Sequence, residues 1–98
     1  MVQNDAQFNV HKYLIIYISM KDIQEHNLDR LRTVQAFLRW YRINSGYSQQ
    51  MLSECSEVHR NTIVRYESCI PVNINLLTVF RIADAMQLDV NQIFEEIK

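Results

Sequence analysis

The stretch GYSQQMLSECSEVHRNTIVRYES, residues 46–68, decides the fold of this chain. Its apolar spacing predicts a short helix from Gln49 to Cys55, a tight connector from Ser56 to Val58, and a second helix from about His59 to Ser68. Apolar side chains are expected to face one another across this corner: Met51, Leu52, Val58, Ile63 and Tyr66. The stretch therefore predicts a helix, a turn and a helix.

The outward face of the second helix is polar. Arg60, Asn61, Thr62 and Arg65 are expected to point away from the core. An arginine can hydrogen-bond O6 and N7 of guanine together, and an asparagine can do the same with N6 and N7 of adenine. Such a face has the chemistry to contact base edges in the DNA major groove.

The composition is typical of one mostly helical domain. A length of 98 residues suits a single modest core, and one Gly and one Pro leave little room for hairpins. The most apolar run, Tyr13 to Met20, is far shorter than the roughly 20 residues that a membrane span needs, and it lacks a cleavage site. Cys55 and Cys69 do not make a secreted disulfide framework. We therefore expect a cytoplasmic protein without a signal peptide or anchor.

Positive charge is concentrated around the opening stretch. The formal net charge is −1, but residues 30–65 hold six arginines against two glutamates, which gives +4. Residues 1–29 carry −2 and residues 66–98 carry −3. Because phosphate contacts supply much of protein–DNA affinity, this asymmetry favours a DNA partner, although charge asymmetry alone is weak support.

An apolar run near the N-terminus predicts a strand. Residues 13–18 are β-branched and aromatic, as in a strand buried on both faces. No second strand is evident, so this strand is expected to pair with its copy in a dimer or to lie as an arm across the helices. Another interpretation is that Met20 is the natural start and that residues 1–19 lie outside the working protein.

Helical periodicity continues on both sides of the opening stretch. A helix is expected from Lys21 to Asn44, either unbroken or divided by a cap at Thr33, with Gly46 after its end. Its buried stripe would be Ile23, Leu28, Leu31, Val34, Leu38 and Tyr41. A fourth helix is expected from about Asn75 to Met86, with Asp89 capping a short fifth. The core face of the fourth would be Leu76, Val79, Phe80, Ala83 and Met86.

Residues 34–95 resemble the lambda-repressor/Cro type of helix-turn-helix, the Xre-like family of DNA-binding domains. The landmarks are Leu38, Arg42, Ser48, Gln49, Leu52, Val58, Thr62, Ile63, Glu67, Leu76, Ala83, Leu88 and Asp89. None is diagnostic alone, but their joint spacing is strong. The resemblance implies an all-α, five-helix lambda-repressor-like domain at residues 33–98. Residues 1–32 would be an N-terminal extension holding the short strand and an added helix, as an arm or dimerisation element.

The resemblance also implies roles for individual residues. The Gln49–Cys55 helix would sit over the DNA backbone, and the His59–Ser68 helix would enter the major groove. Arg60, Asn61 and Arg65 match the base-reading positions of the family. Backbone contacts, or support of the recognition helix, are expected at Gln49, Ser48, His59, Thr62 and Ser68.

Arg42 and Glu67 match a family pair that bridges the first and third helices. Such a pair would fix the angle at which the recognition helix is presented, and breaking it would leave a partly buried charge. Its role would be structural support. The alternative is two unrelated surface charges.

Several positions depart from the family pattern. Glu57, Cys69 and Gln87 stand where Gly is common. A non-Gly residue with positive φ costs on the order of 1 kcal/mol, so either the turns are remodelled or strain is tolerated. His59 replaces the usual Ser or Thr cap, which is expected to weaken the start of the recognition helix while adding a phosphate donor.

Three exposed positions of the family are apolar here. Phe37 and Trp40 are three residues apart and so share a helix face. Residues 13–32 are their expected cover, folded back on the same domain or exchanged with a second protomer. The candidate arm or dimer contacts are Tyr13, Ile15, Tyr17, Phe37, Trp40 and Leu77.

The leading hypothesis is a sequence-specific DNA-binding transcriptional regulator, expected to be a repressor that binds double-stranded DNA as a homodimer. One alternative is an antitoxin that binds both a toxin and its operator. Another is a protein-interaction module that has lost DNA binding, which the near-zero net charge and Glu57 favour. An enzyme is not expected, because no nucleophile elbow, phosphate loop or carboxylate pair occurs. Cys55 and His59 without further ligands do not make a zinc site, and no metal or cofactor is expected.

Overall fold

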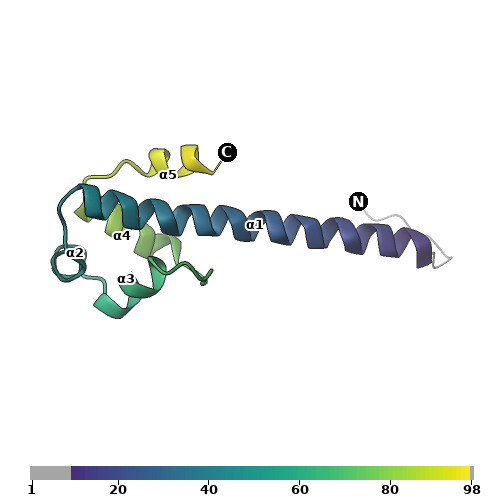
Figure 1. Ribbon diagram of the computed structural model, residues 1–98, viewed down its shortest axis with the longest axis horizontal. Coiled ribbons are helices and arrows are strands. Elements are labelled where there is room, and N and C mark those ends of the chain that lie inside the picture. The colour runs from purple at the N-terminus through teal and green to yellow at the C-terminus, as the bar shows by residue number, and fades with distance from the viewer. Residues whose placement is uncertain (1–9, 98) are drawn as a thin grey trace.

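The computed structural model contains five helices and, within the part of the chain that it describes, no strand (Figure 1). It describes the backbone of residues 10–97 and, apart from residues 10–13, 15–19 and 21, their side chains. The helices are α1 (Val10–Asn44), α2 (Gln49–Ser56), α3 (Arg60–Tyr66), α4 (Leu76–Ala85) and α5 (Val90–Glu96). The predicted all-α, five-helix fold is confirmed.

The first helix is much longer than the others. α1 has 35 residues and, at 1.5 Å per residue, is about 50 Å long. Its C-terminal half lies between α5 on one side and α3 and α4 on the other, whereas its N-terminal half projects beyond them (Figure 1). The molecule is therefore elongated, with extents of 59 × 25 × 24 Å.

The strand predicted for residues 13–18 is wrong, because the backbone there belongs to α1. β-branched and aromatic residues prefer strands only weakly and only where neighbouring strands pack against them. A lone strand would leave its backbone donors and acceptors unpaired, whereas a helix pairs them within the segment. The side chains of Tyr13, Ile15 and Tyr17 lie outside the described residues.

α1 is unbroken at Thr33, which was a candidate cap. Thr33 Oγ1 instead donates to the carbonyl oxygen of Asp29 at 3.0 Å, one turn earlier in the same helix. The predicted apolar stripe is buried only in its second half. Val34 and Leu38 are in the core, whereas Ile23 and Leu28 are exposed. The N-terminal half of α1 thus presents apolar side chains that no described part of this chain covers.

The core forms where the C-terminal half of α1 meets the four short helices. Its buried apolar side chains are Val34, Leu38, Leu52, Val58, Ile63, Tyr66, Val79, Ile82, Ala83, Met86, Leu88 and Ile93. Burying a side chain of this size contributes roughly 1.5–3 kcal/mol. This cluster fixes the positions of α2 and α3.

Three residues predicted for the core are exposed instead. Met51 is on the outer side of α2, because Leu52 and Ser56 form the inward face of that helix. Leu76 begins α4 at the surface, and Phe80 lies at the edge of the core. The inward face of α4 has the spacing i, i+3, i+4, i+7 and consists of Val79, Ile82, Ala83 and Met86. The prediction for Val79, Ala83 and Met86 is confirmed, whereas Leu76 and Phe80 were wrongly placed on this face and Ile82 was missed.

Two connectors adopt the left-handed conformation without glycine. Gly46 has φ 83° after α1, as predicted, but Glu57 and Gln87 have φ 58° and 56°. Each non-Gly residue in this region costs about 1 kcal/mol. Cys69 has no positive φ. Strain is therefore tolerated after α2 and α4. After α3 the turn is remodelled, so that Cys69 does not need the left-handed conformation.

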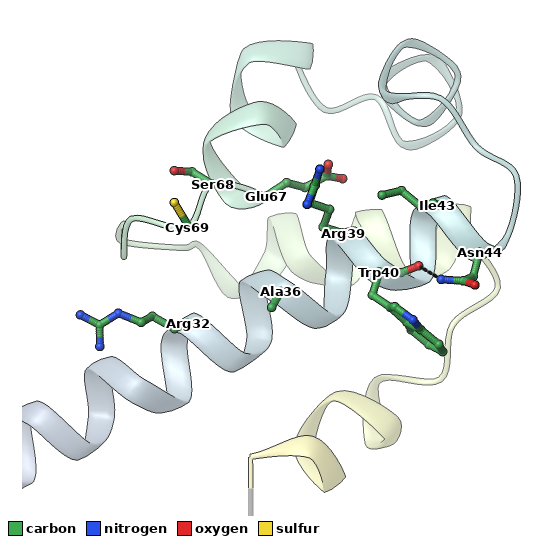
Figure 2. Close-up of a pocket in the computed structure, with 9 residues that line it drawn as sticks. All are labelled: Arg32, Ala36, Arg39, Trp40, Ile43, Asn44, Glu67, Ser68 and Cys69. Carbon is green, nitrogen blue, oxygen red and sulfur yellow. Dashed lines mark hydrogen bonds between the residues drawn. The ribbon is translucent and has the colours of Figure 1, made fainter.

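The aromatic pair on α1 is not covered by the preceding part of its own chain. α1 runs straight away from the domain, so residues 13–32 do not fold back over Phe37 and Trp40 (Figure 1). The two rings stack with their centroids 5.9 Å apart, and Trp40 remains 57% exposed. Asn44 Nδ2 donates to the carbonyl oxygen of Trp40 at 2.8 Å (Figure 2). Leu77 is also exposed.

Candidate nucleic-acid interface

The corner between α2 and α3 is held by side chains from both ends of α2. Ser48 Oγ caps α2 by accepting from the backbone N–H of Met51 at 3.0 Å. The buried Ser56 hydroxyl donates to the carbonyl oxygen of Leu52 at 2.6 Å and accepts from the N–H of Val58 at 3.2 Å. These bonds satisfy the backbone groups that a short helix leaves open at its ends. The turn is thus held by hydrogen bonds on both sides of Glu57, which has positive φ.

His59 caps α3. Its Nδ1 accepts from the backbone N–H of Asn61 at 3.1 Å, the position at which a Ser or Thr oxygen would accept. His59 therefore supplies a cap where a weakened helix start was expected. A neutral imidazole that accepts at Nδ1 carries its proton on Nε2, so Nε2–H is free to donate to an anion in front of the helix.

The exposed face of α3 carries the three predicted base-reading residues. Arg60, Asn61 and Arg65 are all exposed, and the opposite face is anchored by the buried Ile63 and Tyr66. α3 spans Arg60–Tyr66, shorter than the predicted helix from His59 to Ser68. Three long polar side chains therefore project from a fixed helix.

Two further positions complete this surface. Val64 is exposed on the same face, one turn after Arg60, and its methyl groups can contact a thymine methyl. Sequence analysis missed it, although its spacing from Arg60 and Asn61 was the available signal. Thr62 is half-buried, so it lies at the edge of the surface.

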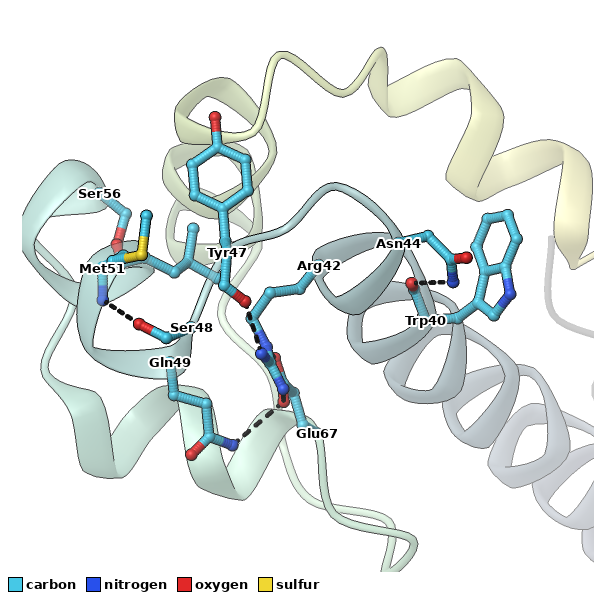
Figure 3. Close-up of polar contacts among 10 residues, drawn as sticks. Trp40, Arg42, Asn44, Tyr47, Ser48, Gln49, Met51, Ser56 and Glu67 are labelled. Atoms are coloured by element: carbon cyan, nitrogen blue, oxygen red, sulfur yellow. Dashed lines mark hydrogen bonds and ion pairs between the residues drawn. The ribbon is translucent and has the colours of Figure 1, made fainter.

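A network of four residues joins the end of α1, the loop and the start of α2 to the end of α3 (Figure 3). Arg42 donates from Nε and Nη2 to the two carboxylate oxygens of Glu67 at 2.6 and 2.8 Å. Its Nη1 donates to the carbonyl oxygen of Tyr47 at 2.8 Å. Gln49 Nε2 donates to Glu67 Oε1 at 3.1 Å. Both side chains of the ion pair are nearly buried, at 11% and 5% exposure.

Gln35 is a buried polar residue that sequence analysis missed. Its Nε2 donates to the carbonyl oxygens of Ser68 and Ile70 at 3.0 and 3.1 Å, and to that of Arg65 at 3.5 Å. Its Oε1 accepts from the N–H of Val72 at 3.2 Å. One α1 side chain thus fixes the end of α3 and the chain that follows it. The available signal was a polar residue within the apolar stripe of α1.

The remaining predicted backbone contacts surround α3. Ser48 and Gln49 lie at the start of α2, and His59 is exposed at the start of α3. Ser68 is half-buried beyond the end of α3, and its Oγ accepts from the N–H of Ile70 at 3.1 Å. Glu57 is exposed in the turn.

The described part of the chain contains no group of three or more metal-ligating side chains. Over the same residues, no helix combines the length and the apolar character required to cross a bilayer. Cys55 and Cys69 are both exposed free thiols.

Comparison with known proteins identifies the family. No curated protein matches the chain at a significant level. The model of the helix-turn-helix family matches residues 38–93, more than half of the chain and the whole of the α2–α3 corner. The chain therefore belongs to the Xre-like, lambda-repressor-like helix-turn-helix family of DNA-binding transcription regulators.

Proposed function

We propose that this regulator is a sequence-specific repressor that inserts α3 into the major groove of its operator. The observation that carries the proposal is the exposed face of α3, where Arg60, Asn61 and Arg65 project from a helix whose other face is buried. The Arg42–Glu67 ion pair holds the end of that helix. Because α3 is already held in place in the free protein, binding DNA should require little further loss of conformational entropy.

Base edges and phosphates would be contacted by different residues. Arg60 and Arg65 would each pair with O6 and N7 of a guanine, and Asn61 with N6 and N7 of an adenine. Phosphate contacts would come from the start of α2 and the two ends of α3, through Ser48, Gln49, His59, Thr62 and Ser68. Occupancy of the operator would repress transcription.

A homodimer would place two copies of α3 on one face of the duplex, with half-sites separated by one or more helical turns of about 34 Å each. The apolar side chains on the projecting half of α1 support this proposal. Met20, Ile23 and Leu28 are each at least 42% exposed. Residues 1–32 would therefore act as the dimerisation element, with helix pairing with helix where strand pairing was expected.

The proposed function is tested by selecting duplexes from a random pool with the full chain and measuring their affinity by gel shift. Asn61→Ala should weaken binding to the selected duplex by about 1–3 kcal/mol and relax the sequence preference at one adenine position. The matched control is Asn91→Ala, at an exposed position of α5 away from α3. Absence of any salt-sensitive, site-selective binding by the native chain would contradict the proposal.

A protein partner is the second candidate, supported by the exposed Trp40 and Leu77. A pure interaction module would bind its partner equally well with Arg60 and Asn61 both changed to Ala. An antitoxin would bind its toxin and would lose only operator binding in that variant. The same double substitution therefore separates the three functions.

A further inference from the structure

A groove of about 650 Å³ runs along the outer side of α1, next to the end of α3 (Figure 2). Its floor is largely apolar and includes Ala36 and Ile43 of α1. Ser68 and Cys69 form the wall that follows α3, and Trp40 lies at the opposite rim. Gln35 fixes this wall through the carbonyl oxygens of Ser68 and Ile70. The groove is thus a built feature of the domain.

The groove carries positive charge. Arg32 and Arg39 line it from the same side of α1, two helical turns or about 10 Å apart. Glu67 also lines it, but both of its carboxylate oxygens are engaged by Arg42. Arg32 pairs with Asp29 at 2.8 Å, and both of those side chains are at least half exposed. An exposed pair of this kind is weak and exchanges readily for a phosphate.

We propose that this groove binds the sugar–phosphate backbone of the DNA strand that flanks α3, with Arg32 and Arg39 contacting two different phosphates. The inference rests on the proposed DNA-binding function and extends the protein–DNA contact from α2 and α3 onto α1. The apolar floor would face deoxyribose. Two charges about 10 Å apart reach separate phosphates, because phosphates follow one another at about 3.4 Å of helix rise along a strand.

Two observations select a DNA strand as the occupant. The groove is continuous with the proposed DNA-binding surface, since Glu67 and Ser68, which directly follow α3, both line the groove. Glu67 also accepts a hydrogen bond from Gln49, a predicted phosphate contact at the start of α2. The guanidinium groups complement phosphate in charge and in hydrogen-bond geometry.

The test compares the native chain with Arg32→Gln/Arg39→Gln on two duplexes, one selected from a random pool and one scrambled. Affinities are measured between 50 and 200 mM salt. Each lost phosphate contact should lower the slope of log affinity against log salt by about 0.9. The ratio of the variant and native dissociation constants should therefore fall about 3.5-fold per contact across this range. Both duplexes should be affected equally, because phosphate contacts carry no sequence information.

Matched controls distinguish the loss of a contact in the groove from a general loss of positive charge. Arg30→Gln removes a charge two residues from Arg32 and hence from the opposite side of α1, where Arg30 donates to Asn27. Arg81→Gln removes an exposed charge from α4. Both should keep the native slope. Arg32→Lys/Arg39→Lys should keep the native slope, since an ammonium group also neutralises a phosphate.

The single tryptophan gives an independent readout, because Trp40 lies at the groove rim. Its fluorescence should change when the native chain binds either duplex and should change less in the double variant. A double variant with the native slope and the native fluorescence change would overturn the groove assignment alone. A native chain that binds neither duplex would overturn the proposed function and the groove assignment with it.

Discussion

Glu67 is a nearly buried residue that joins the end of α3 to α1 and α2. It accepts three hydrogen bonds from Arg42 and Gln49 in a nearly buried site. Glu67→Gln should destabilise the fold by about 3 kcal/mol, because it leaves a buried guanidinium without its counter-charge. Denaturant unfolding measures this loss.

The control for Glu67 is an exposed ion pair of the same kind. Asp29→Asn removes the partner of Arg32 and should change stability by less than about 0.5 kcal/mol, because exposed pairs are screened by water. The double replacement Arg42→Met/Glu67→Leu should recover part of the loss, since it removes both buried charges. If Glu67→Gln costs no more than Asp29→Asn, the ion pair does not hold the helix.

Gln35 has a comparable role just beyond the end of α3. Gln35→Leu should cost about 2 kcal/mol, because it leaves buried backbone groups without partners. Hydrogen exchange at the amide of Val72 should become faster, since that amide donates to Gln35. Gln50→Leu, at an exposed position of α2, is the control and should leave that amide protected. Unchanged protection in Gln35→Leu would contradict this role.

The turn between α2 and α3 stores strain that glycine would relieve. Glu57 has φ 58°, so Glu57→Gly should relieve about 1 kcal/mol of strain and, after the larger entropy of the unfolded glycine chain is deducted, stabilise the domain by up to about 0.5 kcal/mol. Thermal unfolding measures the gain. The same substitution at Glu54, inside α2, should instead destabilise by about 1 kcal/mol. Equal losses at both sites would show that the left-handed conformation is not strained.

The two halves of α1 show what sequence can predict about an element. The apolar periodicity of the sequence identified Val34 and Leu38 as core residues. They pack against helices whose sequences also show an apolar periodicity. For residues 13–18 the local preference for a strand was misleading, because the decisive fact is the absence of a neighbouring strand within the described residues. Local preference predicts an element only where the tertiary partner that it assumes is present.

The residues of the candidate site likewise include some that the sequence could predict and some that it could not. Arg60, Asn61 and Arg65 could be named from spacing, because a short helix next to a buried turn leaves one face exposed. Gln35 and the groove could not be predicted, since both depend on how the end of α3 lies against α1. Contacts that join distant segments have no periodic signal in the sequence.

At the scale of the molecule, the direction of helix pairing in a dimer is constrained by where the domain sits on α1. The exposed Met20 and the buried Val34 and Leu38 are spaced by multiples close to the helical period and therefore share one face of α1. In a parallel pair, the two domains formed by α2–α5 would both have to fit between the α1 helices. Packed helices have axes only about 8–10 Å apart, so the domains would collide. An antiparallel pair sends the domains to opposite ends.

Antiparallel pairing over residues 10–31 has its centre between residues 20 and 21, which predicts a distinct pattern of cross-linking. In a background with Cys55→Ser and Cys69→Ser, Met20→Cys should form a disulfide-linked dimer on oxidation, because each residue 20 lies almost opposite its copy. Asn27→Cys, on the same face of α1 as Met20, should not cross-link, since its copy would be about 20 Å away along the helix axis. Non-reducing electrophoresis measures both. Cross-linking at both positions would establish parallel pairing, and cross-linking at neither would contradict a dimer held by α1.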